Sequence, residues 1–169
     1  YPTVFNFAQY VRENGLDITI TFYGMVESDD KEDFMFCVSQ FPDIVTYGGL
    51  LSQEIISRTL VNYDLMLFPT RYYTEGLPGT IIDAYIANLP VIATDVGGNR
   101  EIVAENITGY LVMPKIPDQL AEAMSNVIAD RLKREAMGKA ARKFCADRFN
   151  ADNWAVYTEQ KFEKSIKQH

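Results

Sequence analysis

Short apolar or β-branched runs alternate with helical patterns along the chain, and this alternation limits the possible folds more than any other feature. Runs typical of strands lie at residues 17–23, 44–47, 64–68, 90–93 and 109–112. Helical patterns lie at residues 2–14, 30–40, 53–62, 78–88 and 100–103, and from residue 118 onward. Gly15 is predicted to end the first helix and Ser52 to cap the third. Strands that alternate with helices form right-handed βαβ units, so the sequence predicts an α/β fold with a parallel sheet and helices on both faces.

Length, charge and residue usage exclude several classes of function. The 169 residues fit one domain, and the net charge of -7 argues against a general nucleic-acid binder. Cys37 and Cys145 lie far apart without metal-ligand spacing, which excludes a disulfide framework and a zinc site. The single histidine, His169, is the last residue, so Ser-His and Cys-His catalysis within this chain is excluded. Any chemistry must rest on carboxylates, hydroxyls, backbone amides, Arg or Lys.

The ends of the chain and its apolar runs give two further expectations. No run approaches the roughly 20 apolar residues of a membrane span, and the start has no signal-peptide pattern. The chain begins at Tyr1 and enters a helical pattern at once. We therefore interpret it as a piece of a longer protein.

Residues 75–90 predict an anion-binding site at the start of a helix. Pro78 suits the first helical position, because its missing N–H costs nothing there. The amides of Gly79 and Thr80 then lie among the free N–H groups of the first turn, where the helix macrodipole also favours negative charge. Gly76 and Gly79 let a ligand approach the backbone closely. The alternative is that both glycines are ordinary turn residues.

Two carboxylates flank this predicted site. Glu75 lies just before the helix, and Asp83 points back toward the helix N-terminus. A phosphate on the amides beside a carboxylate suits a nucleotide, because carboxylates accept hydrogen bonds from ribose or sugar hydroxyls. An equally weighted alternative makes Asp83 only a solvated partner of the helix dipole.

Helical periodicity also predicts which face of this helix is buried. One stripe is predicted to face the sheet, and it is formed by Ile81, Ile82, Tyr85, Ile86 and Leu89. The opposite side carries Gly79, Thr80, Asp83 and Ala87.

Residues 75–103, EGLPGTIIDAYIANLPVIATDVGGNREIV, resemble the signature of retaining glycosyltransferases of family 4. That signature has two glutamates separated by seven residues, then a helix, a strand like LPVIA and a T-D-x-G-G-x-x-E loop. The flanking segments agree, since residues 20–24 (ITFYG) and 107–112 (ITGYLV) resemble the family's neighbouring strands. The resemblance covers essentially the whole chain. It implies that residues 1–169 form a single Rossmann-like, donor-binding domain, the C-terminal half of a GT-B fold with a helical C-terminal tail.

The resemblance also implies roles for individual residues. Glu75 matches the glutamate that contacts the donor sugar near its reacting carbon, and it is the predicted catalytic residue. Asp83 matches the second glutamate, which holds the ribose hydroxyls, and it is one methylene shorter. Gly79 and Thr80 match the amides that hold the donor diphosphate, and Asn88 stands where a left-handed residue follows the helix. The other predicted donor-binding residues are Gly76, Leu77, Tyr47 and Gly48, the last two near the nucleotide base. Gly97 and Gly98 are interpreted mainly as a turn before the next helix, with lining of the interdomain cleft loop as their second role.

The implied function is transfer of a sugar from a nucleotide-diphosphate sugar to an acceptor hydroxyl with retention. The implied setting is cytoplasmic polysaccharide, capsule or lipopolysaccharide biosynthesis, with a glycan or lipid-linked acceptor. No metal or other cofactor is expected, because basic residues and a helix terminus replace it. The family's basic pair and the N-terminal acceptor domain would precede Tyr1, so this chain alone is expected to be inactive. Arg71 is the nearest basic candidate within the chain, with a solvated loop arginine as the favoured alternative.

Three alternatives stay open at this point. A GT-B-fold sugar-nucleotide epimerase is an enzyme of another class, and the lack of an internal histidine counts against it. A non-catalytic nucleotide-sugar-binding partner is the second, since Asp83 departs from the family's glutamate. The basic run at residues 131–148 is interpreted as a solvated face, with peripheral contact to the inner face of a membrane as the lesser alternative.

Overall fold

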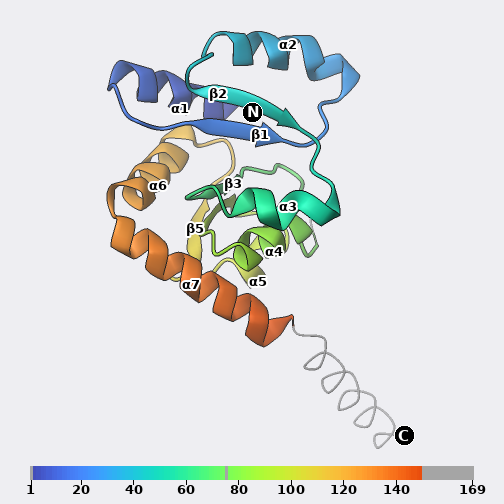
Figure 1. The fold of residues 1–169 in the computed structure, drawn as a ribbon, viewed down its shortest axis with the longest axis vertical. Helices are drawn as coiled ribbons and strands as arrows, with labels where there is room; N and C mark the ends of the chain where they lie inside the picture. Colours follow the sequence, from blue (N-terminus) through green and yellow to red (C-terminus); the bar gives the residue numbers. More distant parts are fainter. Residues whose placement is uncertain (1, 75, 150–169) are drawn as a thin grey trace, which may run out of the picture.

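The computed structural model describes residues 2–74 and 76–149. Within them the elements are, in chain order, α1 (Pro2–Glu13), β1 (Ile20–Tyr23), α2 (Ser28–Ser39), β2 (Val45–Gly49), α3 (Gln53–Leu60), β3 (Met66–Phe68), α4 (Gly79–Ile86), β4 (Val91–Thr94), α5 (Asn99–Ile102), β5 (Gly109–Val112), α6 (Pro117–Ala129) and α7 (Arg131–Arg148) (Figure 1). The alternation of strands and helices predicted from the sequence is confirmed. The first and third strands are shorter than predicted, beginning at Ile20 and Met66 rather than at residues 17 and 64.

The strands are parallel, as predicted, but the described residues form two separate ladders instead of one continuous sheet. β1 pairs with β2, and β4 pairs with both β3 and β5. Side chains join the two sheets, because Phe7 of α1 packs in one apolar cluster with Ile20 of β1 and Leu67 of β3. Helix α1 therefore bridges the β1–β2 pair and the larger sheet.

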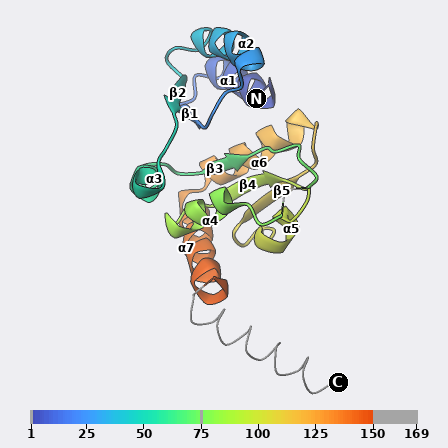
Figure 2. The ribbon, with the colours of Figure 1, turned by 90° about the vertical axis from the view of Figure 1, so that its right-hand side faces the viewer.

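Helices cover both faces of the β3–β5 sheet. Ile92 of β4 packs into the apolar cluster that contains α1 and α6. Its neighbours Val91 and Ala93 pack into the cluster that contains α3, α4 and α7. Successive residues of a strand point to opposite faces, so β4 contributes to both cores and is fully buried. Figure 2 shows the sheet between α6 on one side and α4 and α7 on the other.

The environment of α4 corrects the predicted buried stripe. Ile81, Tyr85 and Leu89 are buried as predicted. Ile86 is 40% exposed, however, and Ala87, assigned to the outer side, is only 6% exposed. The reason is that α7 packs along α4: the backbone oxygen of Asn88 lies 2.0 Å from where a Cβ on Gly138 would stand. Only a glycine permits that approach.

Tyr85 anchors α4 to the loop before β5. Its hydroxyl lies 2.7 Å from Thr108 Oγ1 and donates to the Ile102 carbonyl oxygen at 3.2 Å. Burial raises the pKa of Tyr85 to about 12, so the hydroxyl keeps its proton at neutral pH. These bonds satisfy a polar atom inside the core and hold the last turn of α4 against the segment before β5.

Several predicted helix ends are confirmed and others are wrong. Gly15 follows α1 with φ +58°, and Asn88 follows α4 with φ +59°, the left-handed conformation expected of both. Pro78 precedes α4 as its N-cap instead of occupying the first helical position. Ser52 is the N-cap of α3, but its side chain makes no capping hydrogen bond. The helical region from residue 118 is interrupted at Asp130, whose carboxylate accepts from the Lys133 amide and so starts α7.

Candidate functional site

A cavity of about 320 Å³ lies at the carboxyl ends of β1 and β2. In open parallel sheets this is the edge at which ligands bind. Four aromatic side chains, Phe22, Tyr23, Phe34 and Tyr47, form much of its wall. Tyr72 also lines the cavity; it lies in the loop after β3, a strand of the other sheet, and is 70% exposed. The volume is at the lower end of the range of small-molecule sites.

Tyr47 forms one fixed wall of this cavity. Its hydroxyl donates to the Gly24 carbonyl oxygen at 2.8 Å. The Gly24 amide in turn donates to the Gly49 carbonyl oxygen at 2.9 Å. The two strand ends are thereby tied together. The structure thus gives Tyr47 a ring facing the cavity and a hydroxyl already bonded to the protein.

Gly48 has a packing role that the sequence did not predict. The register of β1 and β2 shifts at Phe22 and Tyr23, which leaves Gly48 as the extra residue of a bulge on β2. A Cβ on Gly48 would stand 2.2 Å from Cε1 of Tyr23. The Tyr23 ring therefore lies directly on the Gly48 backbone. Gly48 shapes the cavity by admitting this ring, whereas a base contact by Gly48 itself stays a prediction.

The Tyr23 side chain is held from its other end by Tyr63, which precedes β3. The two hydroxyl oxygens are 2.8 Å apart, and the rings meet edge to face. This hydrogen bond, together with burial, raises the pKa of Tyr23, so the hydroxyl is neutral and can donate. The pair connects the β1–β2 unit to the rest of the fold beside the cavity.

Carboxylates and an exposed methionine complete the cavity. Glu27 and Asp30 line it from the start of α2, and Met25 lines it from the loop after β1. Sequence reasoning assigned no site role to Tyr23, Met25, Glu27, Asp30 or Tyr72. The available signal was general, because the loop after Tyr23 follows a strand end, where ligands bind in such sheets.

The N-terminus of α4 is open to solvent. Gly79 and Thr80 are exposed, and a Cβ on Gly79 or Gly76 would meet nothing within 4 Å. The first amides of a helix have no carbonyl partner within the helix. Packing among the described residues therefore does not require glycine at either position. Leu77 beside them is 54% exposed.

Asp83 is a half-buried carboxylate on α4. Burial raises its pKa, and no hydrogen bond or ion pair to it is found among the described residues. It lies near Cys145 of α7, whose thiol pKa is raised by burial and, to a lesser degree, by Asp83. A carboxylate that loses water without gaining a partner can still accept hydrogen bonds from the hydroxyl groups of a ligand. Glu75 lies outside the described residues, so its predicted role stays a prediction.

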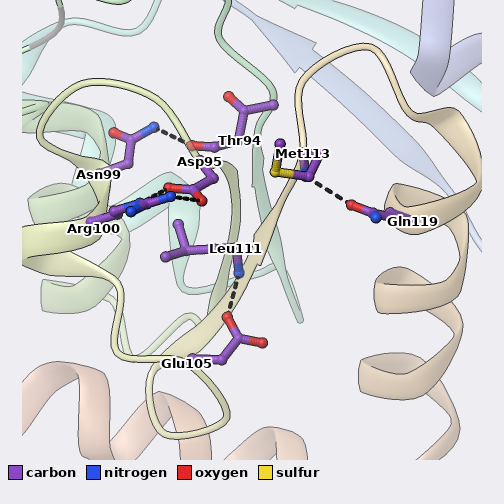
Figure 3. A network of polar contacts seen from close by, with 8 residues as sticks. All are labelled: Thr94, Asp95, Asn99, Arg100, Glu105, Leu111, Met113 and Gln119. Carbon is purple, nitrogen blue, oxygen red and sulfur yellow. Dashed lines mark hydrogen bonds and ion pairs between the residues drawn. The ribbon is translucent and has the colours of Figure 1, made fainter.

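The loop after β4 is fixed by its own polar contacts, shown in Figure 3. The Asn99 side-chain amide donates to the Thr94 carbonyl oxygen at 2.8 Å. Asp95 pairs with Arg100, and this guanidinium lowers the pKa of the Asp95 carboxyl. Gly97 takes φ +53° in the turn between them. The structure shows Gly97 and Gly98 in this turn, and their contact with a cleft stays a prediction.

The basic run on α7 has partners within the fold. Arg131 pairs with Glu135 and Lys143 with Asp147 along the helix, while Arg134 reaches Asp64. Three further basic side chains donate to Tyr110 or to backbone carbonyl oxygens, namely Lys133, Arg142 and Arg148. These contacts account for most of the run without a membrane.

No helix in the ranges 2–74 and 76–149 is both long and apolar enough to cross a membrane. Within the same ranges, no three His, Cys, Asp or Glu side chains are grouped so that they could hold a metal ion.

Comparison with known proteins places this arrangement in a family. The family model described as "Glycosyl transferases group 1" matches residues 3–144. The chain is 35% identical over 124 residues to α-maltose-1-phosphate synthase of Mycobacterium tuberculosis, covering 70% of this chain and 29% of that protein. It is 32% identical over 120 residues to the GDP-mannose-dependent α-(1-6)-phosphatidylinositol monomannoside mannosyltransferase of the same organism, covering 68% of this chain and 31% of that protein. The chain thus spans about three tenths of the length of these curated relatives.

A solved structure supports the same fold. Sucrose-phosphate synthase from Thermosynechococcus elongatus superimposes with a TM-score of 0.80 and 23% sequence identity, over 99% of this chain and 42% of that chain. This chain therefore has the fold of the GT-B glycosyltransferases, as its sequence predicted. None of these relatives is named an epimerase, and that alternative is not favoured. The chain belongs to the glycosyl transferases group 1 family.

Proposed function

We propose that this chain is the donor-binding part of a retaining glycosyltransferase that uses a nucleotide-diphosphate sugar. The chain spans about three tenths of the length of its curated relatives, which supports the proposal that it is one part of a longer protein. The rest of that protein would supply the acceptor site and the basic residues for the diphosphate. The observation that carries the proposal is the cavity of about 320 Å³ at the carboxyl ends of β1 and β2, in a chain of this family.

The cavity is suited to the base of the nucleotide. Flat aromatic side chains such as Tyr47 and Tyr72 offer surfaces for a planar ring. The carboxylates of Glu27 and Asp30 can accept hydrogen bonds from N–H groups of a base. One related protein is named as GDP-mannose-dependent, which supports a nucleotide-sugar donor for this chain.

The diphosphate and ribose would lie at α4. The free amides of Gly79 and Thr80 would receive the diphosphate, and the open space before the helix supports this. Asp83 would accept hydrogen bonds from the ribose hydroxyls, since its carboxylate has no partner among the described residues. When the sugar leaves, negative charge grows on the diphosphate, and amides placed there beforehand stabilise it. Glu75 would lie at the donor sugar, beside the reacting carbon.

The remaining parts of the proposal rest on the sequence resemblance. The transfer would proceed with retention, without a metal ion or another cofactor, to a hydroxyl of a glycan or a lipid-linked acceptor. Polysaccharide, capsule or lipopolysaccharide assembly in the cytoplasm, with or without peripheral membrane contact, is the proposed setting.

A binding experiment on the full-length protein tests the donor site. Calorimetric titration with GDP, UDP and ADP should reveal one preferred nucleotide. Asp83→Ala should weaken its binding by about tenfold or more, because a hydrogen bond to a charged group contributes about 1.5–3 kcal/mol. The matched control is Glu122→Ala, an exposed carboxylate on α6. Equal nucleotide affinity in wild type and Asp83→Ala would remove Asp83 from the ribose site, and no nucleotide binding at all would refute the proposed function.

A further inference from the structure

Two basic side chains from separate loops line one small hollow above the larger sheet. Arg71 follows β3, and Lys115 follows β5. Both line a hollow of about 20 Å³ at the carboxyl ends of β3–β5. Apolar side chains, including Val112 and Leu120, form its floor. This hollow is separate from the cavity at β1 and β2, although Arg71 is adjacent in sequence to Tyr72, which lines that cavity.

Hydrogen bonds hold the backbone of both loops. Thr94 Oγ1 at the end of β4 donates to the Thr70 carbonyl oxygen, next to Arg71. The Met113 amide donates to Gln119 Oε1 at 2.8 Å, which closes the loop that carries Lys115 (Figure 3). The two cations therefore start from fixed positions on either side of the hollow. Little backbone ordering remains when a ligand binds.

Lys115 stands in a conformation that lysine rarely adopts. Its φ is +66°, in the left-handed region that glycine and asparagine occupy most easily. A lysine there costs stability that a glycine would not. Strained backbone of this kind is often found at functional sites. The strained backbone makes Lys115 a candidate for a role other than folding.

The two cations differ from other basic side chains among the described residues. No ion pair to Arg71 or Lys115 is found in the described parts of the chain, whereas Arg100 and Lys143 each have a carboxylate partner. The whole chain carries a net charge of -7, so a hollow lined by two cations without a carboxylate partner among the described residues is opposite in sign to the chain as a whole. Arg71 and Lys115 are both exposed, so an anion from solution can reach them.

We propose that Arg71 and Lys115 form a binding site for a phosphate-bearing group. The hollow has room for about one water molecule. The phosphate therefore lies across its mouth, between the guanidinium and the ammonium group. Two sources share this chemistry, the diphosphate of a nucleotide and a phosphate on the second substrate. The site stands on these residues alone and does not depend on which molecule fills the cavity at β1 and β2.

Inorganic pyrophosphate is the probe. Its dissociation constant is measured by calorimetry on the full-length protein, for wild type, Arg71→Gln, Lys115→Gln and the double variant. Each single variant should weaken binding by about fivefold or more, and the double variant by more than either. Lys139→Gln, an exposed lysine of α7, is the control with the same loss of charge and should bind like wild type. Equal affinity in wild type and the double variant overturns the proposal.

Two further arms separate folding from binding and identify the source of the phosphate. Lys115→Gly relieves the left-handed strain, so it should raise the melting temperature while it weakens pyrophosphate binding. A variant that is more stable and binds equally well would overturn the role of Lys115. The titrations are then repeated with saturating nucleoside diphosphate. If the variant-sensitive pyrophosphate binding is lost, the site serves the nucleotide, and if it persists, the site serves the second substrate. If pyrophosphate binding is lost in the double variant, the phosphate site is supported even when no nucleotide binds to the protein. Failure of the phosphate site can therefore be told apart from failure of the donor-site proposal.

Discussion

Gly48→Ala is a sharp test of how the cavity at β1 and β2 is built. The new Cβ would stand 2.2 Å from Cε1 of Tyr23, and 2.8 Å from Cδ1 and Cζ of the same ring. Carbon atoms in contact are about 3.5–4.0 Å apart, so the ring would have to retreat by roughly 1.5 Å. Its hydroxyl is 2.8 Å from that of Tyr63, and such a movement breaks this hydrogen bond unless Tyr63 follows. The substitution therefore combines overpacking with the loss of a polar contact.

The size of the effect follows from these two components. Overpacking in a well-packed region costs about 1–3 kcal/mol. The hydrogen bond between Tyr23 and Tyr63 contributes about 1 kcal/mol. We expect Gly48→Ala to lower the free energy of unfolding by about 2–4 kcal/mol, a large fraction of the total stability of a domain. Because Tyr23 lines the cavity, nucleotide affinity should fall as well.

The assay is equilibrium urea unfolding of a double-mutant cycle with Tyr23→Leu. Removing the ring makes room for the methyl group, so Gly48→Ala should cost at least about 1 kcal/mol less in the Tyr23→Leu background than in wild type. Gly76→Ala is the control, since a Cβ there meets nothing within 4 Å. Gly48→Ala and Gly76→Ala with equal stabilities, or a cycle that is additive, would refute the packing of Tyr23 on Gly48.

Three other substitutions probe one buried hydroxyl and two partly buried carboxylates. Tyr85→Phe leaves the Ile102 carbonyl oxygen without its donor and the Thr108 hydroxyl without one partner, so it should lower the free energy of unfolding by about 1–3 kcal/mol in urea. Wild-type stability would contradict the buried bonds. The pKa of Asp83 is raised by burial, so the folded state binds this proton more tightly than the unfolded state does. The resulting loss of folding stability is absent below the carboxyl pKa of the unfolded state, and it grows as the pH rises through the pKa of the folded state. Asp83→Asn should remove this loss when stability is measured from acid to neutral pH, and an unchanged pH profile would argue against the burial. The pKa of Asp95 is lowered by Arg100, so the charged carboxylate stabilises the fold above the pKa of the unfolded state, and this contribution is lost as pH falls through the pKa of the folded state. Asp95→Asn should flatten the acid limb of the profile of stability against pH. An acid limb as steep as that of wild type would disprove the pairing.

Local sequence signals predicted the elements because they act over a few residues. The apolar run VIA at 91–93 is buried on both faces of a strand, as its lack of alternation indicated. Asn88 takes the left-handed conformation after α4, because asparagine tolerates it at little cost. The motif at residues 75–103 likewise indicated a glycosyltransferase, since its order and spacing are specific, and the family model that matches is that of glycosyl transferases group 1.

The composition of the site was predicted only in part. Periodicity placed Ala87 on the outer face of its helix, yet α7 buries it, and Ile86 is left exposed instead. A period describes one helix, and it contains no information about a second helix packed from another direction. Gly48 was assigned to the nucleotide base, which stays a prediction, and the structure adds a contact that was not predicted, with the ring of Tyr23. The signal for that contact lies in how two strands are aligned, which no single segment encodes.

The sequence by itself therefore determined the order of strands and helices, the parallel arrangement and the family. The tertiary structure alone decided which side chains meet. Tyr72 faces a cavity formed by β1 and β2, Tyr63 bonds to Tyr23 across 40 residues, and Arg71 shares a hollow with Lys115. The physical reason is range: backbone propensity and capping depend on neighbours in sequence, whereas cavities and charge clusters depend on loops that only the packed sheets bring together.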